Sequence, residues 1–232
     1  METRLGSGAM FDRIAPKYDV MNRMMSLGLD QRWRRKLIAM LELKPGDRVL
    51  DVATGTADVA LAIAQTIPQS MVVGVDPSNA MLAVGRQKII ASQLQQRIEL
   101  LGGSAEALPF VDQQFSGTCI SFGIRNVPDR DLGLREMIRV TKSGGRVAVL
   151  ELGEPSTGPF GFFARLYVHR VVPLLGRIFA GRSTEYTYLK DSVAKFPAPE
   201  VFAASMVRAG LRDVKFSRLS FGAAHLYVGI VK

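Results

Sequence analysis

Short apolar runs alternate with helix-like segments through the middle of the chain, and this alternation restricts the possible folds more than any other feature. The apolar runs predict buried strands at Arg48 to Ala53, Met71 to Asp76, Arg97 to Gly103, Gly117 to Gly123 and Gly144 to Leu152. Helices are predicted between them at Ala57 to Ile67, Ser78 to Ser92 and Asp129 to Thr141. Strands that alternate with helices predict a parallel sheet, with right-handed crossovers and helices on both faces.

The C-terminal part of the chain breaks this alternation. After a predicted helix from Pro199 to Ala209, the runs DVKFSRL and HLYVGIV are separated only by a short Gly/Ala turn, which indicates an antiparallel hairpin. Five alternating units and a terminal hairpin are typical of the class I methyltransferase fold, an α/β fold with a mostly parallel seven-stranded sheet. We therefore expect a single domain over residues 1–232, with a helical N-terminal cap at 1–43 and a helical insertion at 153–198.

Composition limits the classes of protein to consider. With 232 residues and 47% hydrophobic residues, the chain has enough apolar material for a sizeable core. The single cysteine, Cys119, excludes an internal disulfide, and with two histidines it leaves too few ligands for a Cys/His zinc site. No apolar run reaches about 18 residues, and the N-terminus lacks a signal-peptide h-region, so we expect a soluble intracellular protein. The net charge of +9 fits nucleic acid or an anionic membrane as a partner.

Three predicted strand ends carry polar residues where ligands bind in doubly wound sheets. The first, VLDVATGTAD, has Gly55 for a tight turn and Asp51 just before it. A carboxylate there would repel a phosphate but suits a cation, although a simple turn with Asp51 bound to backbone fits equally well. The second is Asp76, placed to accept hydrogen bonds from ribose hydroxyls or to cap the next helix. The third is GSAEALPF, whose amides and Glu106 could bind an adenine edge.

The sequence resembles the S-adenosylmethionine-dependent C-methyltransferases of menaquinone and ubiquinone biosynthesis, from about Phe11 to Lys232. The motifs that carry the resemblance are YDVMNRMMSLGLDQRW, SAEALPF, SFGIRNVPD, RVTKSGGRVAVLELGEP and YTYLKDSVAKFP. The chain departs from the family pattern at five positions. The family usually has Gly in place of Ala57 and Ser in place of Gly153, and often has other residues in place of Asp30, Ser104 and Ser143.

The resemblance implies S-adenosylmethionine as the cofactor and a reduced, polyprenylated quinone as the substrate. It implies cofactor contacts for Asp51, Gly55, Thr56 and Asp76, with Asp76 at the ribose. Further cofactor contacts are implied for Ser104 and Ala105 at the adenine and for Ser121 at the methionine part. Arg125 and Asn126 are implied to face the quinol, and Asp58 and Tyr188 also fall on the substrate side. The most specific expectation is conversion of demethylmenaquinol to menaquinol, with a related benzoquinol or phytyl-naphthoquinol as the alternative.

Carbon methylation needs an electron-rich ring, so only the reduced quinol should react. Arg125 is our candidate for stabilising a phenolate-like oxygen, because its guanidinium offers several donors and stays protonated. The alternative is a surface arginine that pairs with Asp129 or Asp131. For the proton acceptor, Tyr18, Asp19 and a water held by Asp58 are equivalent candidates. His225 is expected to be structural, His169 to face lipid or solvent, and Cys119 to pack in the core.

The segment from Pro159 to Arg182 combines Phe, Leu and Val with four arginines and no acidic residue. This composition favours contact with an anionic membrane over a plain cap helix, and the basic run from Arg32 to Lys36 would add to the same face. We therefore expect a cytoplasmic protein peripheral at the inner face of the membrane, and a homodimer is possible.

Two other kinds of function compete with this interpretation. A methyltransferase acting on nucleic acid or on another aromatic small molecule fits the charge, but the chain shows neither an added recognition domain nor an aromatic-rich basic stripe. A non-catalytic, cofactor-binding scaffold at the membrane is the third possibility. Cofactor binding without turnover on any quinol would distinguish it from an enzyme.

Overall fold

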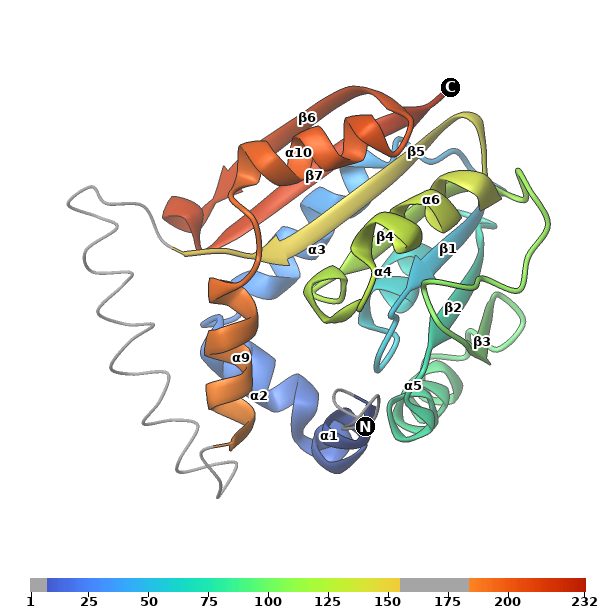
Figure 1. Cartoon of the computed structure of the whole chain (residues 1–232). Coiled ribbons are helices and arrows are strands. Elements are labelled where there is room, and N and C mark those ends of the chain that lie inside the picture. Colours follow the sequence, from blue (N-terminus) through green and yellow to red (C-terminus); the bar gives the residue numbers. More distant parts are fainter. Residues whose placement is uncertain (1–7, 155–183) are drawn as a thin grey trace.

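The computed structural model describes residues 8–154 and 184–232, and it is built around one seven-stranded sheet (Figure 1). The strand order is β3-β2-β1-β4-β5-β7-β6. The strands are β1 (Arg48–Val52), β2 (Met71–Asp76), β3 (Ile98–Gly102), β4 (Phe115–Ser121), β5 (Thr141–Leu152), β6 (Leu211–Leu219) and β7 (Ala224–Val231). Only β7 runs antiparallel to its neighbours, β5 and β6. The predicted class I methyltransferase fold is confirmed, including the terminal hairpin.

Helices cover both faces of the sheet. One face carries α3 (Leu29–Met40), α4 (Asp58–Thr66) and α5 (Asn79–Ala91), and the other carries α6 (Arg130–Val140) and α10 (Pro199–Arg208). Two buried clusters match these two layers. Trp33 and Leu37 of α3 pack with α4 and α5 in one cluster, while Met137 of α6 and Phe202 of α10 pack in the other. The strands between them are buried on both faces, which explains their apolar sequences.

The remaining described elements are an N-terminal helical cap and several short helices and turns. The N-terminal cap consists of α1 (Gly8–Ile14), the 3-10 turn η1 (Ala15–Lys17), α2 (Tyr18–Met25) and α3. A second turn, η2 (Ile124–Asn126), follows β4, and α9 (Thr184–Ala194) precedes α10. A third, η4 (Ser220–Gly222), joins β6 to β7. The segment predicted to contact the membrane, with His169 inside it, lies outside the described residues.

The strand order reverses between β1 and β4. From β1 the chain continues to β2 and β3 on one side of the sheet, and from β4 it continues to β5 on the other side. In such sheets ligands bind beyond the carboxyl ends of the strands at this switch point. Asp51, Asp76 and Ser121 stand at or next to the carboxyl ends of β1, β2 and β4. The topology therefore gathers the predicted site residues at one edge of the sheet.

Candidate active site

The turn between β1 and α4 is held in a conformation that favours glycine. Gly55 has a φ of 56°, and the flanking Ala53 and Ala57 have φ values of 51° and 65°. The left-handed region is rarely occupied by residues with a Cβ, so both alanines are strained. Hydrogen bonds fix the turn to the next strand: the Thr54 amide donates to the carbonyl of Val75 over 3.0 Å. The backbone at this strand end is therefore fixed before any ligand binds.

Asp76 connects this turn to the start of α5. One carboxylate oxygen accepts from the Gly55 amide over 2.9 Å, and the other accepts from the Ser78 amide over 2.8 Å. Ser78 is itself the N-cap of α5, so Asp76 does not have the capping role that the sequence left open. Burial raises the pKa of Asp76 against these two hydrogen bonds, and the nearby Asp12 adds to the rise. Each oxygen keeps lone-pair capacity for a hydroxyl donor.

Asp51 is buried beneath the turn. Its carboxylate accepts from the Thr54 hydroxyl over 2.6 Å and from the Cys119 thiol over 3.7 Å. Burial raises the pKa of Asp51 to about 7, although the bond from Thr54 opposes the rise. A cation bound close to this carboxylate would favour its ionised form. Cys119 is fully buried in β4, as expected for a packing residue.

The loop after β3 is ordered mainly by its own polar groups. The Ser104 hydroxyl accepts from the Glu106 amide over 3.2 Å, and Glu106 accepts from the Asp129 amide over 3.0 Å. Glu106 therefore supports the start of α6, and this contact was not anticipated from the sequence. Ala105 is buried against that helix, and Ser104 is exposed. Their predicted place at an adenine ring stays a prediction.

Ser121 ends β4 with a hydroxyl oxygen that is buried and has no hydrogen-bond partner among the described residues. Buried polar groups without partners are uncommon in folded proteins and often mark a ligand position. The orphan hydroxyl lies at the strand end where the methionine part of S-adenosylmethionine is expected. Together with the free lone pairs of Asp76 and the buried Asp51, it fits that cofactor.

Arg125 is buried, and its partner is Glu151 at the end of β5. Nη1 donates to the Glu151 carboxylate and to the Phe122 carbonyl, both over 2.6 Å. The exposed fractions of the two side chains are 6% and 0%. The alternative of a surface arginine paired with Asp129 or Asp131 is therefore wrong. Asp129 instead caps α6 by accepting from the Leu132 amide.

Glu151 also organises the backbone around Arg125. Its carboxylate accepts from the amide of Arg125 over 3.1 Å and from the amide of Leu152 over 2.8 Å. A buried carboxylate with three donors is well satisfied. The Nε of Arg125, in contrast, is buried with no partner among the described residues. The sequence reasoning missed Glu151, although an acidic residue near the end of the fifth strand was a signal of the same kind as Asp51 and Asp76.

Asn126 lies next to Arg125 in η2 and meets α9. The Tyr188 hydroxyl donates to Oδ1 of Asn126 over 3.0 Å. Burial raises the pKa of Tyr188, against the opposing influence of the Arg125 charge. Two residues predicted on the substrate side, 62 positions apart in the chain, are thus brought together. Because Tyr188 occupies the amide oxygen, Asn126 is left with its NH₂ group as a donor.

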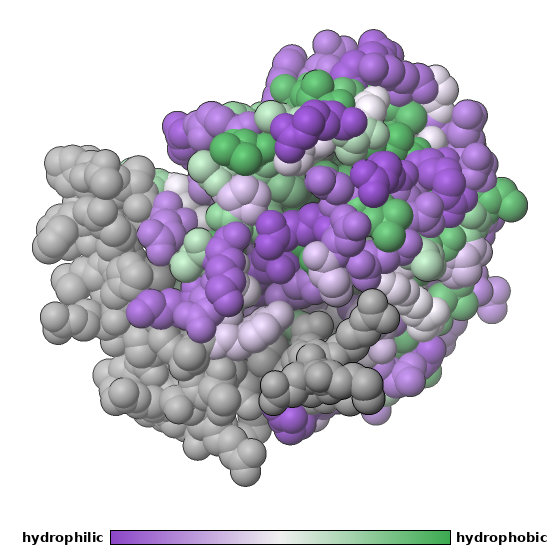
Figure 2. Space-filling model, in the orientation of Figure 1, coloured by the Kyte–Doolittle hydropathy of each residue, from purple (hydrophilic) through white to green (hydrophobic). Residues whose placement is uncertain are grey.

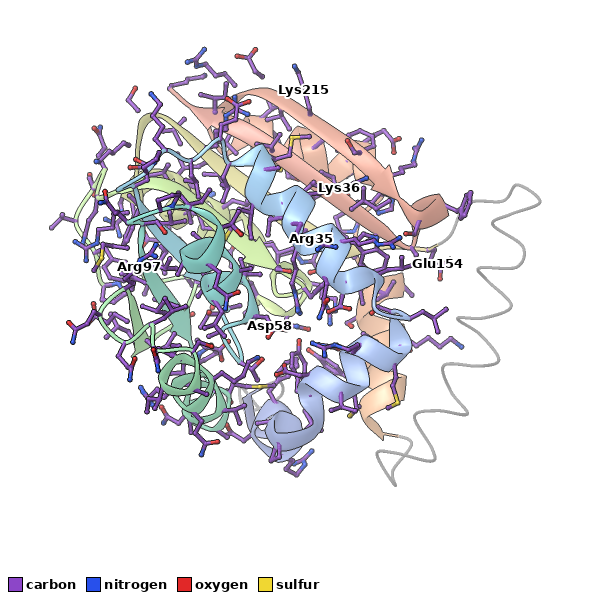
Figure 3. All side chains as sticks on the ribbon, turned by 180° about the vertical axis from the view of Figure 1, so that it is seen from behind. Arg35, Lys36, Asp58, Arg97, Glu154 and Lys215 are labelled. Atoms are coloured by element: carbon purple, nitrogen blue, oxygen red, sulfur yellow. The ribbon has the colours of Figure 1, made fainter. Side chains whose placement is uncertain are left out.

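Thr56 and Asp58 belong to a polar network that connects the N-terminal cap to α4 and α5 (Figure 3). The Thr56 hydroxyl donates to Asp19 of α2, and Asp58 forms ion pairs with Arg34 of α3 and Lys88 of α5. Lys88 also pairs with Asp19 over 2.7 Å. The network holds α2 and α3 against the turn between β1 and α4. The side-chain oxygens of Thr56 and Asp58 are used inside it.

This network separates the three candidates for the proton acceptor. Burial alone would raise the pKa of Asp58, but Arg34 and Lys88 outweigh it and lower that pKa. A carboxylate held between two cations is a weak base. Asp19 likewise accepts from Thr56 and pairs with Lys88. Tyr18, at the start of α2, lies outside these ion pairs and makes an edge contact with Phe11.

His225 is a buried residue of β7, as expected for a structural histidine. Its imidazole lies directly against Gly153, where an added Cβ would come within 2.3 Å of Nδ1 and Cε1. Burial lowers the pKa of His225, and Arg218 adds to this effect. The His225 ring therefore leaves no room for a side chain at position 153, where the family usually has serine.

Comparisons with known proteins identify a family for the chain. A model of the ubiE/COQ5 methyltransferase family matches residues 2–231. The chain is 47% identical over 221 residues to the ubiquinone/menaquinone biosynthesis C-methyltransferase UbiE of Geobacter sulfurreducens, which covers 95% of this chain and 86% of that protein. It is 44% identical over 220 residues to the demethylmenaquinone methyltransferase of Thermus thermophilus, which covers 95% of this chain and 99% of that protein.

A solved structure supports the fold alone. The structure of a putative S-adenosyl-L-methionine-dependent methyltransferase from Methanococcus maripaludis superposes with a TM-score of 0.70 at 15% sequence identity. That superposition covers 100% of this chain and 97% of the other.

Proposed function

The chain belongs to the ubiE/COQ5 methyltransferase family, whose members are S-adenosylmethionine-dependent C-methyltransferases of quinone biosynthesis, and we propose that it converts demethylmenaquinol to menaquinol. The observation that carries the proposal is the cluster of Arg125, Asn126 and Tyr188, formed at the turn that follows the end of β4, where the Ser121 hydroxyl is buried without a partner. The Thermus relative, which matches over nearly its whole length, is a demethylmenaquinone methyltransferase, and this favours the naphthoquinol ring. A related benzoquinol or a phytyl-naphthoquinol is the second candidate, since the Geobacter relative is named for both pathways.

The cofactor half of the site would bind and orient S-adenosylmethionine. S-adenosylmethionine, when bound, supplies a sulfonium methyl group to a nucleophile. Asp76 would accept from the ribose hydroxyls with the lone pairs that Gly55 and Ser78 leave free. Asp51 would provide a buried negative charge for the cationic part, and Ser121 a hydroxyl for the methionine group. Ser104 and Ala105 would contact the adenine, and Gly55 would allow close backbone approach.

The substrate half would activate and orient the quinol. A quinol ring carbon becomes more nucleophilic as the neighbouring hydroxyl loses its proton. Asn126 would donate to that oxygen through Nδ2, because Tyr188 holds its Oδ1. Arg125 would donate to the same oxygen with the N–H groups that Glu151 and Phe122 do not use. Holding the ring carbon about 3–3.5 Å from the reacting methyl carbon supplies much of the remaining rate enhancement.

The quinol proton would pass to the Tyr18 hydroxyl while that hydroxyl releases its own proton to solvent. Asp58 lies between Lys88 and Arg34, which lower its pKa and make it a poor acceptor, and Asp19 is already paired with Lys88. In this assignment Asp58 and Thr56 hold the N-terminal helical cap against the turn between β1 and α4.

An assay with labelled S-adenosylmethionine tests the function directly. Reduced demethylmenaquinone and a reduced demethylated benzoquinone are offered side by side, and the products are identified by mass spectrometry. We expect methylated naphthoquinol as the main product and no product from strictly oxidised quinone. Faster turnover of the benzoquinol would assign the second candidate. Cofactor binding with no turnover on any quinol would support a scaffold instead.

The proposed substrate carries a polyprenyl tail, so we also propose that the protein acts at the inner surface of a membrane as a peripheral protein. No helix within residues 8–154 and 184–232 is long and apolar enough to cross a membrane. Possible homodimer formation stays a prediction from the sequence.

A further inference from the structure

α2 and the turn that follows it carry exposed apolar and basic side chains. Val20 and Arg23 lie in α2, Leu27 lies in the turn between α2 and α3, and all three are exposed. The exposed fractions of Val20 and Leu27 are 59% and 69%. No residue of α2 is buried. This part of the N-terminal cap therefore presents both apolar and basic side chains to its surroundings.

The outward side of α3 continues this surface with more positive charge. Arg32, Arg35 and Lys36 are exposed, and Met40 follows one turn after Lys36. Figure 3 shows α2 and α3 one after the other on the same side of the molecule, with Arg35 and Lys36 labelled. Within the described part of the chain, none of these basic residues forms an ion pair. They make up the α2–α3 face together with Val20, Arg23 and Leu27.

The acidic residues of the two helices are turned inward. Asp19 pairs with Lys88, and Asp30 is buried and pairs with Arg34 over 3.2 Å. The two helices hold no other acidic residue. Their negative charges are therefore neutralised in the interior, which leaves the α2–α3 face purely positive.

A lysine from the C-terminal hairpin lies on the same side of the sheet. Lys215 of β6 pairs with Val228 of β7, and paired residues of an antiparallel ladder project to the same side. Val228 packs in the cluster that contains α3, so Lys215 projects toward the α3 layer (Figure 3). On the opposite layer charges are mixed, as with Arg139 beside Asp112 and Glu136. Figure 2 shows hydrophilic and hydrophobic residues interspersed on that side of the molecule.

We infer that the α2–α3 face docks on an anionic lipid bilayer, with the basic residues at the headgroups and Val20 and Leu27 at the acyl boundary. This inference rests on the proposed function, which requires access to a lipid-soluble substrate. Exposed aliphatic side chains among unpaired cations are the composition of an interfacial element. Nucleic acid fits less well, because its bases stack on aromatic rings and Trp33, the aromatic residue of α3, is 6% exposed.

Vesicle flotation with the full chain tests the inference. The protein is mixed with vesicles of phosphatidylcholine alone or with phosphatidylglycerol added, at low and high salt. We expect binding only to the anionic vesicles, and weaker binding at high salt. The Arg35→Gln/Lys36→Gln variant should bind about 30-fold more weakly, from roughly 1 kcal/mol for each basic residue near the surface. The Val20→Ser/Leu27→Ser variant should weaken binding at both salt concentrations.

The matched control is Arg135→Gln/Arg208→Gln, which removes two exposed charges from α6 and α10, the helices of the opposite layer. It should change vesicle binding less than about threefold, although its net charge equals that of the Arg35/Lys36 variant. Equal losses in both variants, or unchanged binding of the Arg35/Lys36 variant, would overturn the inference. Binding of single-stranded RNA through Arg35 and Lys36, without vesicle binding, would also overturn it.

A tail-less quinol analogue separates this inference from the proposed function. All three variants should methylate that water-soluble analogue at the unmodified rate. Vesicle binding without turnover of any quinol would reject the function and keep the docking face. Turnover without vesicle binding would keep the proposed function and reject the docking face.

Discussion

Replacement of Arg125 by lysine is the most direct test of the substrate half of the site. Lysine keeps the positive charge, and it still reaches toward Glu151. Its ammonium could still donate to the Phe122 carbonyl and the Glu151 carboxylate, which Nη1 alone binds, but it loses the other N–H groups of the planar guanidinium. If Arg125 also donates to the quinol oxygen, the loss of one such donor should reduce turnover by about 10²–10³, or roughly 2.7–4 kcal/mol.

The structure also requires a stability cost for this variant, because the pair is buried. Removing a partner from a buried ion pair costs about 3–5 kcal/mol. Glu151 keeps its backbone donors at Arg125 and Leu152, and lysine restores part of the charge interaction. We therefore expect a loss of about 1–3 kcal/mol, which lowers Tm by about 2–4 °C per kcal/mol for a chain of this size.

Turnover, Tm and cofactor affinity are measured on the same Arg125→Lys preparation. Arg139→Lys is the control, since Arg139 also combines carboxylate ion pairs with hydrogen bonds to backbone carbonyls, in a more exposed place away from the site. The control should lower Tm and leave turnover within about twofold of the original protein. Near-native turnover of Arg125→Lys, with a fall in Tm like that of the control, would refute the catalytic assignment.

Four further outcomes follow from the geometry. Asp76→Ala should weaken cofactor binding by roughly 1.5–3 kcal/mol in calorimetric titration while the protein stays folded; unchanged affinity would contradict its ribose role. Asp51 has a pKa of about 7 when folded and an ordinary one when unfolded, so the free energy of unfolding should fall as pH rises from about 4 to 7. Asp51→Asn should flatten that slope in denaturant titrations across this range. Ala57→Gly should raise the free energy of unfolding by up to about 1 kcal/mol, because φ is 65° there. A lower free energy of unfolding for this variant in denaturant titration would argue against backbone strain at Ala57. Gly153→Ser should cost about 1–3 kcal/mol through overlap with the His225 ring, and His225→Ala in the same chain should recover part of this in a double-mutant cycle.

The fold could be predicted nearly completely, because its signals are local. The run from Met71 to Asp76 is a strand with those same bounds, and the hairpin at the end of the chain has the expected direction. The largest differences are at strand starts: β4 begins at Phe115 and β5 at Thr141, a few residues before the predicted positions. The polar residues in both starts gave no apolar signal, and neighbouring strands supply the hydrogen bonds that extend them.

The site could be predicted only where one residue at a strand end carries the signal. Asp76 is such a residue, whereas Asn126 was suggested by the family resemblance; the functional roles of both stay predictions. Thr56, Asp19 and Asp58 appeared available for a ligand or a proton, but Lys88 and Arg34 occupy them from other helices. Lys88 and Asp19 are 69 positions apart, and no local pattern in the sequence reports such a pair.

The pairing of Arg125 with Glu151 changes what the arginine offers to a substrate. Nearby acidic residues in the sequence suggested Asp129 and Asp131 as partners, yet the partner is a buried carboxylate 26 positions away. A buried Arg–Glu pair carries almost no net charge, so long-range attraction cannot be its main contribution to an oxyanion. What remains is directed hydrogen bonding from the rest of the guanidinium, in a place where its Nε already lacks a partner. This is why a lysine that preserves the charge should still lose turnover.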